Sequence, residues 1–147
     1  MNAWEFHVGT KSYVKYQIVC SLGDPHIIAV HGPFKGPSQD GTIAIHTLTD
    51  LLLQNEKGLA DKQYRNVEFA IVPVSGHRFV LDDVDNAWNA DVYSVRQVIE
   101  RIIKRTHNFG CIKCRWAYSL ELHQKFVFAF CKLTNLALIC QPLDKDF

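Results

Sequence analysis

The chain has 147 residues, of which 48% are hydrophobic, and its 16 basic residues nearly balance 15 acidic ones. This is the length of one domain with enough apolar side chains to fill a core, so we expect a single domain over residues 1–147. The balanced charge argues against an autonomous DNA-binding module, whose surface is strongly basic.

The sequence predicts no membrane segment and no signal peptide. Its longest apolar run, Phe126 to Cys131, is far shorter than the roughly 20 residues that a spanning helix needs. Residues 1–5 show no basic flank that leads into an apolar stretch. Because the five cysteines are odd in number and lie mostly in apolar runs, we expect free thiols and an intracellular location, in the nucleus or the cytoplasm.

Two strands, a loop and a helix are predicted first along the chain. Residues 13–21 alternate roughly between apolar and polar, and residues 26–31 form a short apolar run, so the pattern predicts a β-hairpin. The glycines and prolines of residues 32–41 indicate a loop. Apolar residues near helical spacing then predict a helix from Thr42 to about Asn55.

The rest of the chain is predicted to add two strands and two helices. Residues 58–61 and 67–74 have the composition of strands, and the three acids of residues 82–89 indicate a polar loop. Helical spacing predicts a helix of about four turns from Val92, and residues 120–138 are apolar nearly all round, which predicts a second, buried helix. This order of elements is typical of an α/β layer fold with helices packed on a mixed sheet.

Three carboxylates stand at positions where a metal site would need them. Asp40 ends the glycine- and proline-rich loop, and Asp61 directly follows a predicted strand, at the end where α/β sheets place ligands. On a helical wheel, Glu100 falls about 80° from Val92, on the flank of the apolar stripe. Carboxylate oxygens suit Mg²⁺, and two such ions can clamp the attacking and leaving oxygens in phosphoryl transfer.

Each of these acids also has a structural interpretation. Asp40 could cap the helix that follows it, and Asp61 could be an ordinary turn residue. Glu100 has Arg96 four residues before it and Lys104 four residues after it, a spacing that favours surface ion pairs. Spacing alone therefore favours the structural interpretation.

A zinc site is a further alternative. His107, Cys111 and Cys114 have a spacing that is compatible with zinc, and His123 could be a fourth ligand. A single CxxC pair is a weak signal, since the chain offers no second pair at a standard interval.

The segments around the three acids follow the pattern of one known family. Five elements occur in order: GPSQD at residues 36–40, GLADKQY at 58–64, RQVIE at 96–100, FGC at 109–111, and CKLTN at 131–135. With these elements, residues 11–138 resemble the DDE-type transposase nuclease domain of the Harbinger/PIF class, with Thr134 where histidine is usual. Asp61 and Glu100 are 39 positions apart (100 − 61), a separation in the range of that family.

The resemblance implies an α/β fold of the RNase H-like kind, with a mixed sheet flanked by helices. It also implies the catalytic domain of a divalent-metal-dependent DNA endonuclease or transposase, with Asp61 and Glu100 as catalytic residues. Asp40, Asp61 and Glu100 would be the ligands of Mg²⁺ or Mn²⁺. DNA is then the expected partner, together with a separate DNA-binding protein and a further copy of the chain as a homo-oligomer.

One part of the family pattern has no counterpart in the sequence. The first catalytic aspartate of the family lies upstream of the segment that residues 11–15 resemble, and residues 1–10 hold no aspartate. Glu5 is the only acid there, and it lies too close to residue 11 to serve. We therefore expect a partial domain that lacks its first strand or strands and is inactive alone. The alternative is a non-catalytic, transposase-derived interaction or DNA-binding module.

Overall fold

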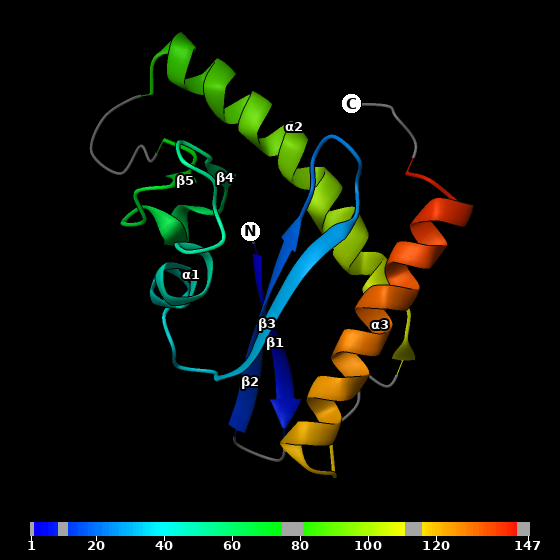
Figure 1. Cartoon of the computed structure of the whole chain (residues 1–147). Coiled ribbons are helices and arrows are strands. Elements are labelled where there is room, and N and C mark those ends of the chain that lie inside the picture. The colour runs from blue at the N-terminus through cyan, green and yellow to red at the C-terminus, as the bar shows by residue number, and fades with distance from the viewer. Residues whose placement is uncertain (1, 9–11, 75–80, 111–115, 144–147) are drawn as a thin grey trace.

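Strands near the start of the chain form a central antiparallel sheet. β1 (Asn2–Val8), β2 (Ser12–Cys20) and β3 (Ile27–Lys35) pair in the order β1-β2-β3, so β2 is the middle strand (Figure 1). The structure is a computed structural model, and it describes residues 2–8, 12–74, 81–110 and 116–143.

A second, smaller sheet and three α-helices complete the described part of the chain. β4 (Gly58–Leu59) and β5 (Ala70–Ile71) pair in parallel and are separate from the central sheet. A 3-10 helix, η1 (Lys62–Tyr64), follows β4 closely. The α-helices are α1 (Asp40–Leu48), α2 (Asp83–Thr106) and α3 (Leu120–Cys140).

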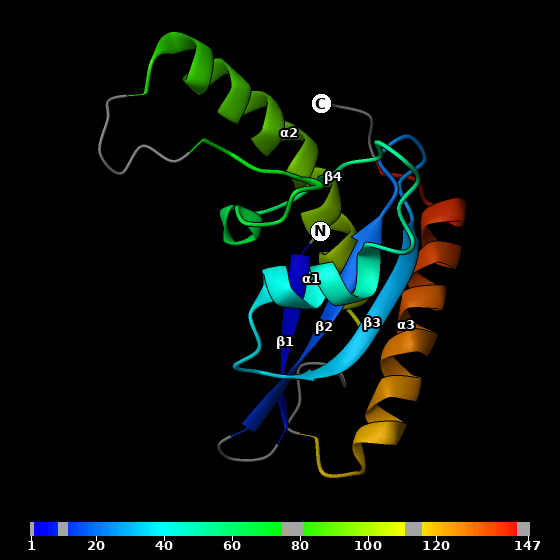
Figure 2. The same cartoon turned by 60° about the vertical axis from the view of Figure 1, so that its left-hand side comes forward.

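The central sheet is covered on both faces because the side chains of β2 alternate between two cores. Tyr16 and Ile18 belong to a core with residues of α2 and α3, and the Tyr16 hydroxyl lies 2.9 Å from His123 Nδ1 of α3. Gln17, between them, faces the other way and accepts a hydrogen bond of 2.5 Å from Thr47 of α1. Accordingly, α1 and α3 lie on opposite sides of the sheet (Figures 1 and 2).

The second core lies under α1. It contains Leu48 of α1 together with Ala60, Tyr64 and Val67, which come from the segment between β4 and β5. All four side chains are buried. Burial of a large apolar side chain contributes roughly 1.5–3 kcal/mol to stability, so this core stabilises the region. The β4–η1 segment is therefore held firmly against α1.

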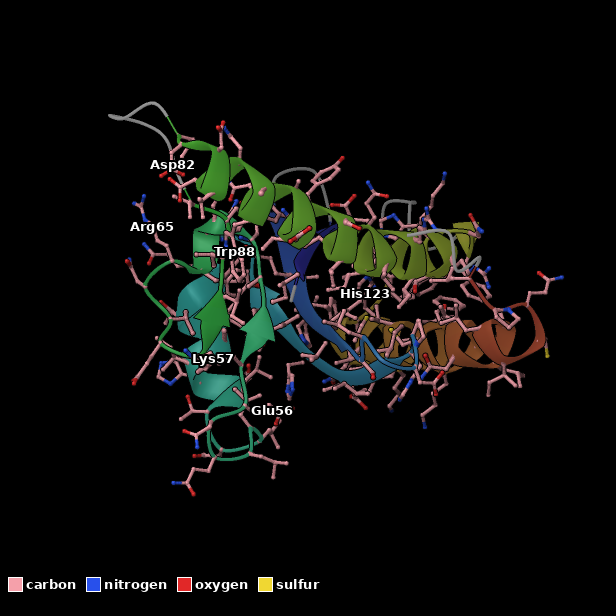
Figure 3. All side chains as sticks on the ribbon, turned by 90° about the horizontal axis from the view of Figure 1, so that it is seen from above. Glu56, Lys57, Arg65, Asp82, Trp88 and His123 are labelled. Carbon is pink, nitrogen blue, oxygen red and sulfur yellow. The ribbon has the colours of Figure 1, made fainter. Side chains whose placement is uncertain are left out.

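Polar side chains of α3 fix that helix along the outer edge of β3. Asn135 accepts a hydrogen bond from the Ile27 N–H and donates one to the Ile27 carbonyl, both at 2.8 Å. Gln124 donates to the Gly32 carbonyl at 2.6 Å. The edge of β3 is thus partly satisfied by α3 rather than by another strand. Seen from above, His123 lies between α2 and α3 (Figure 3).

The predicted mixed sheet is replaced by two small sheets in the described residues, one antiparallel and one parallel. The hairpin of residues 13–31 is present, but β3 continues to Lys35, through the first part of the predicted loop. Strand β1 was not predicted. The α/β class itself is confirmed, whereas its RNase H-like character stays a prediction.

The prediction of a polar loop at residues 82–89 was wrong, because α2 begins at Asp83. The Asp82 side chain accepts a hydrogen bond of 2.8 Å from the Asp85 N–H and so caps the helix. Asp83 and Asp85 lie in the first turn, where negative charge is favoured by the helix dipole. The three aspartates that indicated a loop therefore mark the start of α2.

Helices α1 and α3 also differ from their predictions. α1 ends at Leu48, and Leu51 and Leu53 after it are exposed. α3 buries one face only, while Leu133 and Leu136 on another face are exposed. Within the described residues, no helix combines the length and the apolar character that crossing a membrane would require.

Candidate active site

Asp61 lies at a well-anchored turn after β4. Its neighbour Ala60 is buried and donates a backbone hydrogen bond of 2.8 Å to the Ile71 carbonyl of β5. Asp61 is the N-cap of η1, and its carbonyl accepts a bond of 2.9 Å from the N–H of buried Tyr64. This backbone leaves the Asp61 carboxylate one-third exposed and directed at α2, where Oδ2 lies 3.4 Å from Arg96 Nη2.

Glu100 meets Asp61 through the same arginine. Arg96 Nη2 also lies 3.6 Å from Glu100 Oε1, one turn further along α2. The helix is fixed in this orientation because Val98 and Ile102, on its other face, are buried in the core with β2. Two carboxylates that are far apart in the sequence therefore share one guanidinium group.

Asp40 has a different partner. Lys15 Nζ, from β2, lies 3.1 Å from Asp40 Oδ1 and also donates a bond of 3.2 Å to the Ser38 carbonyl. The N-cap of α1 is Gln39, without a side-chain capping bond, and Asp40 is the first residue of the helix. The capping interpretation of Asp40 is thus replaced by a nearly buried ion pair with Lys15.

The pKa of the buried Tyr64 hydroxyl depends on both aspartates. Burial is the main cause that raises the pKa of Tyr64, and the charges of Asp40 and Asp61 raise it further, whereas the Gln17 side chain lowers it. Both aspartates thus contribute to raising the pKa of Tyr64, although each is held by its own cation.

The structure brings together Asp61 and Glu100 but does not gather all three predicted ligands. In the parts of the chain that the structure describes, no three His, Cys, Asp or Glu side chains could hold a metal ion together. Carboxylates suit a hard divalent cation, but Arg96 lies between two of them and Lys15 neutralises the third. While these ion pairs are in place, the carboxylates are not free to bind a metal ion, and their assignment as metal ligands stays a prediction.

An open cavity of about 640 Å³ lies beside Asp40. Its lining includes the start of α1 and the cationic side chains of Lys15, Lys62 and Arg65. Lys62 and Arg65 are exposed, and Arg65 is seen on the β4–β5 side of the molecule (Figure 3). The surface next to Asp40 is therefore polar and carries positive charge.

The zinc alternative is only partly covered by the structure. Cys111 and Cys114 lie outside the described residues. His123 is buried between the sheet and α3, where its Nδ1 interacts with the Tyr16 hydroxyl and its ring packs edge-on against Trp116. Burial also lowers the pKa of His123. The described surroundings of His123 are those of a core histidine.

The sequence interpretation missed two functional partners. Arg96 was expected to pair with Glu100 only, and Lys15 was not considered as a partner of Asp40. A signal for Lys15 was present, because it is a charged residue in the middle of an otherwise buried, alternating strand. Nothing in the sequence indicated that Arg96 also reaches Asp61.

Comparison with known proteins gives the family. The family model described as DDE superfamily endonuclease matches residues 2–135, which is most of the chain. The chain therefore belongs to the DDE superfamily endonuclease family, as the resemblance implied, while the Harbinger/PIF class stays a prediction. No curated protein and no solved structure matches the chain.

Proposed function

We propose that this chain is the catalytic domain of a metal-dependent DNA endonuclease of the transposase type, of the Harbinger/PIF class. The observation that carries the proposal is the meeting of Asp61 and Glu100, from the β4–η1 turn and from α2, at one guanidinium group in a chain of this family. Asp61 and Glu100 are the catalytic carboxylates. Asp40 is a third ligand for Mg²⁺ or Mn²⁺.

The chemistry follows from these residues. Asp61 and Glu100 offer carboxylate oxygens that can hold a divalent cation, and such a cation stabilises the charge that develops on a phosphodiester during hydrolysis or strand transfer. Lys62 and Arg65, in the cavity beside Asp40, can neutralise backbone phosphates of DNA. A separate DNA-binding protein, a homo-oligomer and a nuclear or cytoplasmic location belong to the same proposal.

Cleavage of supercoiled plasmid in Mn²⁺ tests this function. Because Lys15 and Arg96 are paired with the candidate carboxylates in this arrangement, we expect the 147-residue chain to nick DNA only slowly. Whatever nicking is detected at high protein concentration must disappear in Asp61→Asn and in Glu100→Gln. Nicking that persists in both variants would assign the activity to a contaminant or to other residues.

A non-catalytic interaction or DNA-binding module is the second candidate. The ion pairs favour it, since Lys15 or Arg96 pairs with each of the three carboxylates, as a purely structural role would require. Under this candidate, the purified chain binds DNA or a protein without nicking it, and Asp61→Asn changes stability but not binding.

A further inference from the structure

The Arg96 side chain lies deeper than the two carboxylates that it joins. Its exposed fraction is 17%, compared with 33% for Asp61 and 50% for Glu100. Nη2 lies 3.4 Å from one oxygen of Asp61 and 3.6 Å from one oxygen of Glu100. A single nitrogen thus lies within ion-pair distance of one oxygen from each carboxylate, so it competes with any cation that would bind both oxygens.

The same side chain is incompletely satisfied. Arg96 Nε is buried and has no hydrogen-bond partner in the described part of the chain. A buried donor without an acceptor costs free energy, and that cost disappears when the group returns to water. The guanidinium is therefore held by its two carboxylates rather than by a complete set of hydrogen bonds, and losing those carboxylates to another cation would release it.

We propose that Arg96 is the resident counter-ion of the Asp61–Glu100 site, which holds the two carboxylates together in the metal-free protein and must leave before a divalent cation binds. This inference rests on the proposed function, because it takes Asp61 and Glu100 as metal ligands. Lys15 neutralises Asp40 in the same way, so each carboxylate of the site has an internal cation.

A purely structural role makes a different prediction. The Asp61–Arg96 pair links the β4–η1 segment to α2, and if that were its only role, removing Arg96 would lower stability without changing metal affinity. As a counter-ion, Arg96 competes with metal for the same oxygens, and its positive charge also repels a dication at short range. Removing it should then raise the metal affinity even though stability falls.

The experiment measures Mn²⁺ binding to the full 147-residue chain, from the electron paramagnetic resonance signal of free Mn²⁺, and the melting temperature with and without millimolar Mg²⁺. Arg96→Gln removes the charge and keeps much of the side-chain volume, whereas Arg96→Lys keeps the charge and loses the planar fork. Arg101→Gln is the matched control, because it makes the same charge change on α2 at a residue outside the ion pairs of the described structure.

We expect Arg96→Gln to bind Mn²⁺ about tenfold more tightly than the unmodified chain, and to gain a Mg²⁺-dependent rise in melting temperature. Arg96→Lys and Arg101→Gln should stay close to the unmodified chain. Equal, measurable binding by Arg96→Gln and the unmodified chain would overturn the counter-ion role and leave the proposed metal site standing. Absence of binding in both would overturn the metal assignment as well.

A second measurement applies if Arg96→Gln fails to fold. In the unmodified chain labelled with ¹⁵N-arginine, the Arg96 Nε–H resonance is followed while Mg²⁺ is added. We expect it to move towards the position of a solvent-exposed arginine as the metal saturates the site. A resonance that stays unchanged while melting temperatures show metal binding would contradict the release of Arg96.

Discussion

Lys15 and Asp40 form an ion pair that is almost closed to solvent, with Nζ and Oδ1 3.1 Å apart and 12% and 10% of the two side chains exposed. The pair joins the central strand β2 to the first turn of α1. It therefore fixes the start of α1 against the sheet, next to the cavity that we assign to DNA phosphates.

Breaking this pair should be costly. We expect Lys15→Met to lower the free energy of unfolding by about 3 kcal/mol, because it leaves a nearly buried carboxylate without its cation. Urea denaturation measures the change. Lys125→Met is the matched control, since it breaks the exposed Lys125–Glu121 pair and should cost about 1 kcal/mol or less. Equal effects of the two variants would show that the Lys15–Asp40 pair is solvated.

Asn135 is expected to be a structural residue of the family motif in α3. Asn135→Ala removes both hydrogen bonds to the Ile27 backbone and should destabilise the protein by about 2–3 kcal/mol. Asn135→Asp keeps the acceptor for the Ile27 N–H but loses the donor, so it should retain part of the stability. Thermal unfolding of the two variants tests this order, and an Asn135→Ala variant as stable as the unmodified chain would contradict it.

Stability should fall on acidification because of His123. Burial lowers the pKa of His123 in the folded protein below its ordinary value, so the unfolded chain takes up a proton first as the pH falls. The stabilising contribution is therefore complete above about pH 6.5 and decreases below it. Urea denaturation of the unmodified chain and of His123→Gln between about pH 7.5 and about pH 5 measures this slope.

His31 provides the internal comparison for that measurement. Burial lowers its pKa as well, so His123→Gln should reduce the acid-side slope without abolishing it. A slope that is identical with and without His123 would show that this histidine does not take part.

Cysteine reactivity should follow burial. Burial raises the pKa of Cys20 and of Cys131 to about 12, so both thiols stay protonated and react slowly near neutral pH. Cys140 is exposed and should react with iodoacetamide before Cys20 and Cys131 do. Peptide mapping after a short pulse measures the order, with urea-unfolded protein as the control. Labelling of Cys20 ahead of Cys140 would contradict the packing of β2.

The periodicity of apolar residues predicted much of this fold, but it could not predict which residues far apart in the sequence contact one another. The alternation of β2 and the helical spacing of α2 from Val92 onward were visible because burial on one face leaves a regular pattern. The start of α2 was missed because a cluster of aspartates is typical of loops and of helix N-termini alike. The hydrogen bond of 3.1 Å that the buried Thr134 hydroxyl donates to the Thr106 hydroxyl joins α3 to α2, and no pattern in the sequence indicated it.

The candidate site shows the same limit. Asp61 and Glu100 were proposed from local patterns, since a carboxylate after a strand and one on the flank of a helix are visible in the sequence, and their role stays a prediction. The Arg96 bridge between them depends on how α2 lies against the β4–η1 turn. No spacing rule relates residues on two such elements.

The central claim is that a metal binds between Asp61 and Glu100, and iron-directed backbone cleavage tests it most directly. Fe²⁺ replaces Mg²⁺ in the Arg96→Gln chain, and ascorbate with hydrogen peroxide then produces radicals that cut the backbone next to the bound ion. We expect cuts around Asp61 and Glu100, with a weaker cut near Asp40, all suppressed by excess Mg²⁺ and absent in Asp61→Asn. Cuts confined to the region of His107, or no Mg²⁺-sensitive cuts at all, would contradict the claim.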